Sequence, residues 1–111
     1  MAFKRIKKYN ENDIIGEYHK VNYVNSEFDT IQVEIYASEQ DRLDFKNGIF
    51  DSRFKKTDTF TNYRAGLKEL IETATELPAN CRNIQEAIIH FAYISLTQES
   101  DYYTSEYFEE C

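Results

Sequence analysis

The sequence predicts an α+β fold, in which a small antiparallel β-sheet of about three strands is covered by two C-terminal α-helices. In the first half of the chain, apolar and polar side chains alternate, as they do in strands that bury one face. In the second half, apolar residues recur with the period of an amphipathic helix. The 111 residues fit one domain, and with only 3 glycines and 1 proline the chain offers little material for long linkers.

This single domain, residues 1–111, divides into four segments by composition. Residues 1–10 are basic, residues 14–60 are rich in β-forming residues, residues 61–97 have helical periodicity, and residues 98–111 form an acidic, aromatic tail.

The first two strands are expected to form a hairpin. Residues 14–24, IIGEYHKVNYV, are rich in β-branched and aromatic types. Residues 30–36 alternate strictly, with all three aliphatic side chains on one face. The intervening residues 25–29, NSEFD, have turn character, so the two strands are predicted to pair antiparallel through a short connection.

The charged cluster SEQDRLDFKNG, residues 38–48, allows two interpretations. Ser38 followed by Asp41 resembles a capping box that begins a short helix, which the Asn-Gly pair would end. Alternatively, Asn-Gly is the turn of a hairpin. We favour a helical turn or an ordered loop, followed by a third strand near residues 49–56.

Two helices are predicted next. Apolar residues between 61 and 77 fall on one helical face, and Pro78 ends that helix. Asn83 followed by Glu86 is a second capping signal, and the stripe of residues 83–98 is wide enough for burial against more than one element. The apolar residues are Leu67, Leu70, Ile71, Ala74 and Leu77 in the first helix, and Ile84, Ala87, Ile88, Ile89, Phe91, Tyr93, Ile94 and Leu96 in the second.

The net charge of −7 argues against a general nucleic-acid binder, because phosphate contacts need a basic face. The charge is also uneven. MAFKRIKK at the N-terminus carries four bases and no acid, whereas residues 99–111 carry five acids and no base. These ends can pair within one molecule or between neighbours, or they can be two solvated tails.

Nothing in the sequence indicates catalysis, a metal or a cofactor. Cys81 and Cys111 form no CxxC motif and no disulfide framework, which suits a reducing cytoplasm. Together with His19 and His90 they show no ligand spacing, and His90 lies in an apolar stretch typical of a core or rim residue. The chain has no nucleophile elbow, HExxH motif or phosphate-binding glycine loop, so we expect neither an enzyme nor a small-molecule substrate.

No signal peptide and no apolar run near the ~20 residues of a membrane helix is present, so we expect no membrane partner.

The acidic tail contains Tyr102, Tyr103, Tyr107 and Phe108, and three interpretations remain open. Its charge can imitate a phosphate track for a basic partner. With Tyr103 and Tyr107 at helical spacing, it can instead dock as an amphipathic segment on a neighbour. It can also fold back on its own sheet.

Three stretches, in this order, resemble a group of small virion proteins that tailed bacteriophages encode among their tail and baseplate genes. They are GEYHKVNYV, IQVEIYASEQDRLDF, and AIIHFAYISL followed by acidic residues. The matching positions are Gly16 to Tyr18, then Tyr36, Ser38 and Arg42, and then Ala92, Tyr93 and Leu96. The resemblance covers about half of the chain, and residues 61–80 depart from it by forming an extra helix.

This resemblance implies a non-enzymatic structural or assembly role in a phage tail or baseplate, in a virion assembled in the host cytoplasm. The implied partners are other virion proteins or copies of the chain itself. Arg42, just past a strand end, can clamp a carboxylate on its own chain or on a neighbour, or it can be a solvated surface arginine. The alternative function is an acidic, phage-encoded inhibitor, anti-CRISPR-like or DNA-mimicking, that binds a basic site on a host protein. The candidate interface residues are Tyr36, Arg42, Tyr102, Tyr103, Tyr107 and Phe108.

Overall fold

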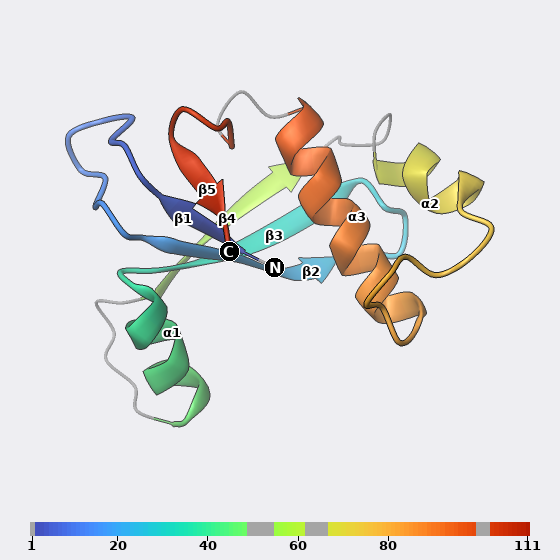
Figure 1. The fold of residues 1–111 in the computed structure, drawn as a ribbon, viewed down its shortest axis with the longest axis horizontal. Coiled ribbons are helices and arrows are strands. Elements are labelled where there is room, and N and C mark those ends of the chain that lie inside the picture. The colour runs from blue at the N-terminus through green and yellow to red at the C-terminus, as the bar shows by residue number, and fades with distance from the viewer. Residues whose placement is uncertain (1, 49–54, 62–66, 100–102) are drawn as a thin grey trace.

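A computed structural model describes residues 2–48, 55–61, 67–99 and 103–111. These residues form a five-stranded antiparallel sheet in the order β4-β3-β2-β1-β5 and three helices (Figure 1). The strands are β1 (Phe3–Arg5), β2 (Tyr18–Val24), β3 (Thr30–Tyr36), β4 (Lys55–Thr61) and β5 (Phe108–Glu110), and the helices are α1 (Glu39–Lys46), α2 (Glu69–Thr73) and α3 (Ile84–Glu99). The predicted fold class, α+β with an antiparallel sheet, is confirmed, and the sheet has two more strands than the three expected.

The predicted hairpin is present as β2 and β3. Ile31, Val33 and Ile35 are buried on one face, as their alternation predicts. However, β2 starts at Tyr18 rather than at residue 14, because Gly16 has a φ of 92° and turns the chain there.

The charged cluster forms the helix α1, so the hairpin interpretation of its Asn-Gly pair is wrong. The Ser38 hydroxyl accepts a hydrogen bond from the Asp41 backbone N–H at 3.1 Å, which caps the first turn. Gly48, with a φ of 86°, follows the end of the helix. The third predicted strand appears later than expected, as β4, and residues 49–54 lie outside the described part of the chain.

The second predicted helix is confirmed as α3, and the Asn83 side chain accepts from the Glu86 backbone N–H at 2.9 Å. The first predicted helix is much shorter than expected where it is described, since α2 ends at Thr73 and Ala74 is already extended. The β-branched threonines on both sides of Ala74 have lower helix propensity than their neighbours. In Figure 1, α3 lies across the sheet, and α2 lies beyond the sheet against α3.

The sequence patterns did not predict β1 and β5, which pair with each other at the two ends of the chain. Lys4 lies opposite Glu109, and the termini are adjacent in Figure 1. The oppositely charged ends therefore pair within one molecule, and the tail folds back on its own sheet. Tyr103 and Tyr107 do not share a helix, because residues 105–107 form a turn that leads into β5.

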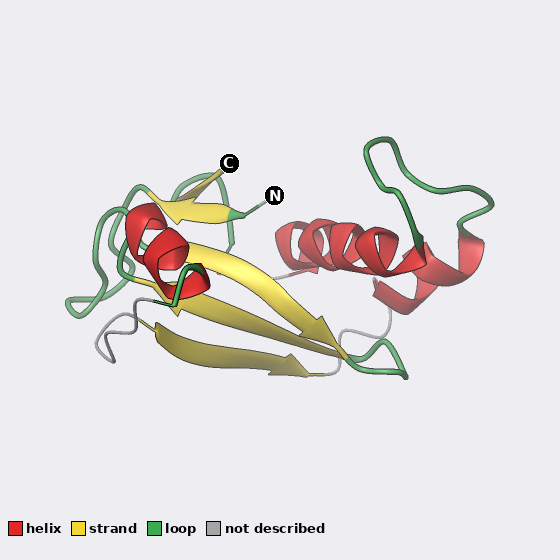
Figure 2. Ribbon diagram, turned by 90° about the horizontal axis from the view of Figure 1, so that it is seen from below, coloured by secondary structure: helices red, strands yellow, loops and turns green. Residues whose placement is uncertain are grey.

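The core lies between the sheet and α3 and is closed by aromatic side chains from both termini. The rings of Phe3 and Tyr103 stack with centroids 4.5 Å apart, and Tyr93 of α3 meets Phe3 edge-on at 5.4 Å. Figure 2 shows α1 at the opposite end of the sheet from α2 and α3. The buried core residues are Phe3, Val21, Ile31, Val33, Ile35, Leu67, Ala92, Tyr93, Leu96, Tyr103 and Phe108.

Candidate functional site

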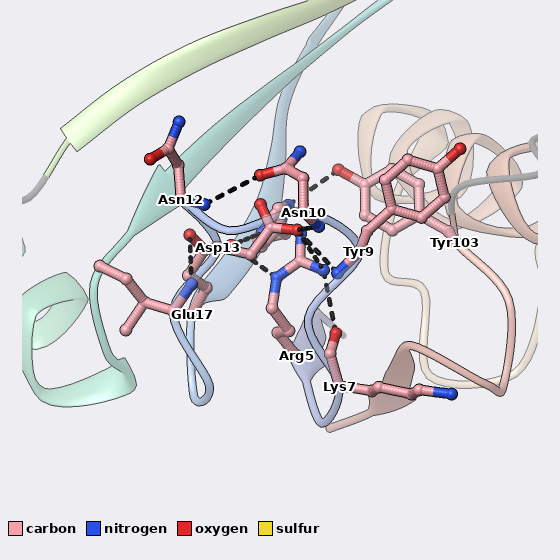
Figure 3. A network of polar contacts seen from close by, with 10 residues as sticks. Arg5, Lys7, Tyr9, Asn10, Asn12, Asp13, Glu17 and Tyr103 are labelled. Atoms are coloured by element: carbon pink, nitrogen blue, oxygen red, sulfur yellow. Dashed lines mark hydrogen bonds and ion pairs between the residues drawn. The ribbon is translucent and has the colours of Figure 1, made fainter.

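A network of buried charged groups lies where β1, β2 and β5 meet (Figure 3). Arg5, Glu17 and His19 are 1%, 3% and 0% exposed. The Glu17 carboxylate atom Oε1 accepts from Arg5 Nε at 2.9 Å and contacts His19 Nε2 at 3.0 Å. The other ring nitrogen of His19 lies 2.9 Å from the Tyr103 hydroxyl. Charged groups are rarely buried unless they are paired and hydrogen-bonded, and here both conditions are met.

Arg5 connects this network to two further segments. Its Nη1 lies 3.3 Å from Asp13 Oδ2 and donates to the Lys7 carbonyl at 3.2 Å. Its guanidinium carbon lies 4.5 Å from the centroid of the Phe108 ring, a cation–π contact with β5. One side chain on β1 therefore holds the following loop and the C-terminal strand.

Glu17 stays ionised in this setting. Burial by itself raises the pKa of a carboxyl group, but the hydrogen bonds and charges of His19 and Arg5 outweigh it and lower the pKa of Glu17 from 4.5 to about 2.

The order Tyr103, His19, Glu17 places a hydroxyl, an imidazole and a carboxylate in series, as in relays that activate a nucleophile. Catalysis also requires access for a substrate. Tyr103 and His19 are both buried, so the arrangement offers no such access. The carboxylates of the network do contact the backbone.

These hydrogen bonds are with the backbone of the loop between β1 and β2. Asp13 Oδ2 accepts from the backbone N–H groups of Tyr9 and Asn10, each at 2.8 Å. Glu17 Oε2 accepts from the Ile14 backbone N–H at 3.3 Å. These buried carboxylates satisfy the polar backbone groups of the loop from within. The apolar side chains of the loop remain in solvent.

We call four exposed side chains of this loop, Ile6, Tyr9, Ile14 and Ile15, together with Tyr107 from the turn before β5, the loop surface. The first four are exposed, with Ile15 at 55%. Tyr107 is half-buried, and its ring centroid lies 5.2 Å from that of Tyr9. At the rim, Lys7 Nζ pairs with Glu106 Oε1 at 3.0 Å in solvent.

A second apolar surface, the helix surface, lies over α2, α3 and the segment between them. It centres on a groove of about 370 Å³, and Ile84 on its wall is 73% exposed. The apolar lining residues are Ile71, Ala74, Leu77, Ile84, Ala87, Ile88 and Phe91. In Figure 1 the loop that carries the loop surface is at the left end of the molecule, and α2 is at the right end.

The six residues proposed from the sequence are dispersed in the structure. Tyr36, Tyr103 and Phe108 are interior side chains, so none of them presents an exposed face to a partner. Tyr36 packs against Phe45 of α1 with centroids 5.8 Å apart, and its hydroxyl donates to Glu34. Tyr102 lies outside the described residues.

The remaining two lie nearer the surface. Tyr107 belongs to the loop surface, and Arg42 is half-buried on α1. In the described part of the chain no carboxylate forms an ion pair with Arg42. The clamp on a neighbouring molecule stays a hypothesis.

Sequence reasoning missed Arg5, Asp13 and Glu17. One signal was available in the alternation of β2, which puts Glu17 and His19 on the same face as Val21. Two ionisable residues on an otherwise buried strand face indicate a partner of opposite charge. The sequence does not say which base supplies it.

Among residues 2–48, 55–61, 67–99 and 103–111, no three His, Cys, Asp or Glu side chains cluster closely enough to hold a metal ion. Within the same ranges no helix has the length and apolar character needed to cross a membrane. No protein-family model, curated protein or solved structure matches this chain.

Proposed function

We propose that this protein is a non-enzymatic assembly protein of a bacteriophage tail or baseplate, where it acts through contacts with copies of itself or other virion proteins. The virion setting comes from the resemblance of the hairpin, α1 and α3 sequences. The mode of action is supported by one observation on the fold, namely two different exposed apolar surfaces at opposite ends of one small domain.

Two unlike surfaces at opposite ends favour a head-to-tail contact. If the loop surface of one copy binds the helix surface of the next, the contact is heterologous and repeats until a ring closes or a filament grows. A symmetric dimer would bring one surface against itself and leave the other exposed. Exposed apolar patches rimmed by polar groups are typical of such contact sites.

The contact is expected to be apolar rather than ionic. The opposite charges of the termini pair within one molecule, with Lys4 opposite Glu109 in the β1–β5 register and Lys7 bonded to Glu106 at the surface. An apolar interface survives high salt, whereas one between exposed charges is screened above about 0.1 M, where the Debye length falls below about 10 Å.

Complementary variants test this proposal. Ile15→Asp spoils the loop surface, and Ile84→Asp spoils the helix surface. Both residues are exposed, so neither change should unfold the domain. Leu43→Asp, an equivalent change at an exposed position on α1, is the matched control.

Size-exclusion chromatography with light scattering, at about 50 and 500 mM salt, should give a salt-resistant oligomer for the wild type and for Leu43→Asp. Each of the other two variants should be monomeric alone, and an equimolar mixture should give a heterodimer, because one intact surface of each kind remains. A mixture that stays monomeric contradicts the head-to-tail contact.

The net charge of −7 favours a second candidate, the acidic inhibitor of a basic host protein. A wild type that stays monomeric at both salt concentrations would direct the next experiment to inhibition of a basic nuclease. DNA mimicry predicts that such inhibition weakens steeply with salt.

A further inference from the structure

The groove of the helix surface contains one carboxylate among its apolar walls. Glu76 lies in the segment between α2 and α3, is exposed, and lines the groove beside Leu77. The other lining residues are apolar, apart from Thr75. The groove measures about 370 Å³, within the range of about 300–1,000 Å³ that is usual for binding clefts. A segment that fills this groove therefore covers a negative charge together with the apolar walls.

Glu76 has no cation of its own chain beside it. In the described part of the chain no lysine or arginine forms an ion pair with Glu76, whereas Glu86 on α3 is bonded to Arg82 at 2.9 Å. A carboxylate that is covered by apolar groups loses its hydration, which costs free energy unless a cation replaces the water. The groove therefore selects an apolar segment that also carries a base.

The loop surface combines exposed apolar side chains with such a base. Lys8 is exposed and directly precedes Tyr9. Lys7 is bonded to Glu106 at 3.0 Å, but Lys8 forms no ion pair within the described residues. Glu11, the exposed acid of the same loop, lies between two asparagines. Lys8 is thus the cation that the loop surface offers to a partner.

The buried network holds the backbone on both sides of this lysine. Arg5 Nη1 donates to the Lys7 carbonyl at 3.2 Å, and Asp13 Oδ2 accepts from the Tyr9 backbone N–H at 2.8 Å. A base on a backbone that is already ordered loses less conformational freedom on binding. Figure 1 shows the loop at the left end of the molecule and α2 at the right end, so the loop of one copy meets the groove of another copy and not its own.

We propose that the groove of one copy receives the loop surface of the next in one orientation, in which Lys8 pairs with Glu76. The apolar side chains supply most of the affinity, and the ion pair sets the orientation. A loop turned the other way would bring Glu11 toward Glu76, and like charges in close contact are unfavourable. The inference rests on the proposed head-to-tail assembly and names the contact that orients it.

Two variants that each keep one apolar surface isolate a single contact. Ile84→Asp keeps the loop surface and is the loop donor, whereas Ile15→Asp keeps the helix surface and is the groove donor. Lys8→Glu is added to the loop donor, and Glu76→Lys is added to the groove donor. Isothermal titration calorimetry at about 150 mM salt then gives the Kd of all four pairings. Each single charge reversal should raise the Kd at least about tenfold, and both together should return it to within about threefold of the starting value.

Two matched charge reversals serve as controls. Lys46→Glu makes the same change of charge in the loop donor, on α1 and outside the loop surface. Glu69→Lys makes it in the groove donor, on α2 but outside the lining of the groove. Because distant exposed charges are screened at this salt concentration, each control should leave the Kd within about threefold. All the substituted residues are exposed, so the urea midpoint of every variant should verify an intact fold.

The outcomes separate this inference from the assembly role. A Kd that neither reversal changes, or a double reversal that binds no better than the single ones, overturns the Lys8–Glu76 pair and leaves the head-to-tail contact standing. Equal losses from the control reversals also overturn the pair, because they indicate an effect of overall charge. Donors that do not associate at all refute the assembly and the pair together.

Discussion

Replacing Glu17 with Gln tests whether the buried network holds the fold together. The isosteric amide keeps an acceptor oxygen but removes the charge, so Arg5 loses the counter-ion at 2.9 Å and keeps Asp13 at 3.3 Å. The pKa of Glu17 falls from 4.5 to about 2 on folding, and at about 1.4 kcal/mol per unit this corresponds to about 3 kcal/mol. Breaking a buried ion pair costs about 3–5 kcal/mol in other proteins, which agrees.

The assay is urea unfolding followed by far-UV circular dichroism or tyrosine fluorescence. With a urea slope of about 2 kcal/mol per M, the midpoint of Glu17→Gln should fall by about 1.5 M at pH 7. Because the folded-state pKa is lowered, the stabilisation is complete above pH 4.5 and disappears as the pH falls toward about 2. The two midpoints should therefore converge in that range.

The control is Glu86→Gln, which breaks an exposed ion pair with Arg82 and should leave the midpoint unchanged. A loss below about 1 kcal/mol for Glu17→Gln, the range of an exposed pair, would refute the reasoning. So would a loss that stays constant from pH 7 to pH 3.

Three further changes probe single contacts. Tyr93→Phe leaves the Val21 N–H without its acceptor, so the free energy of unfolding should fall by about 1–2 kcal/mol and the Val21 amide should exchange faster with deuterium. Phe108→Ala uncovers the interior at β5 and should cost about 3–5 kcal/mol in urea unfolding, whereas a cost below about 1 kcal/mol would place this ring outside the core. Ser38→Ala removes the acceptor for the Asp41 N–H, and a loss of about 1 kcal/mol should appear as faster exchange in α1 but not in β3.

The elements that could be predicted from the sequence are those whose signals are local. β3 shows in the alternation of residues 30–36, and α3 shows in a capping residue followed by a helical stripe. In both elements, the spacing of apolar residues along the sequence predicts which face is buried.

β1 and β5 lack such a signal. Each has three residues, two of them charged. Each pairs with the other, so the strand depends on the opposite end of the chain. The charge contrast between the termini indicated pairing as one possibility but gave no register. Contacts between residues about a hundred positions apart leave no periodicity in either segment.

The same limit explains the site residues. The aromatic residues of the tail were named as candidate interface residues, while docking on a neighbour and folding back on the sheet both remained open. In the structure, alternation within β5 turns Phe108 inward and Glu109 outward. The loop surface was missed because Ile14 and Ile15 were assigned to a strand, whereas Gly16 places them in a turn.

The position of the network also explains why the charged termini are poor candidates for an interface. Arg5 contacts partners in the loop between β1 and β2 and the Phe108 ring of β5, and the exposed Lys7 is bonded to Glu106. A partner that bound these charges would have to separate pairs that already stabilise the fold. Binding through the apolar loop beside them separates no ion pair. Asp13 and Glu17 already accept hydrogen bonds from backbone N–H groups of this loop, and its exposed side chains lose only contacts with water on binding. The network therefore favours a contact through the apolar side chains of the loop. Its charged groups hold the loop in place and would not themselves touch the partner.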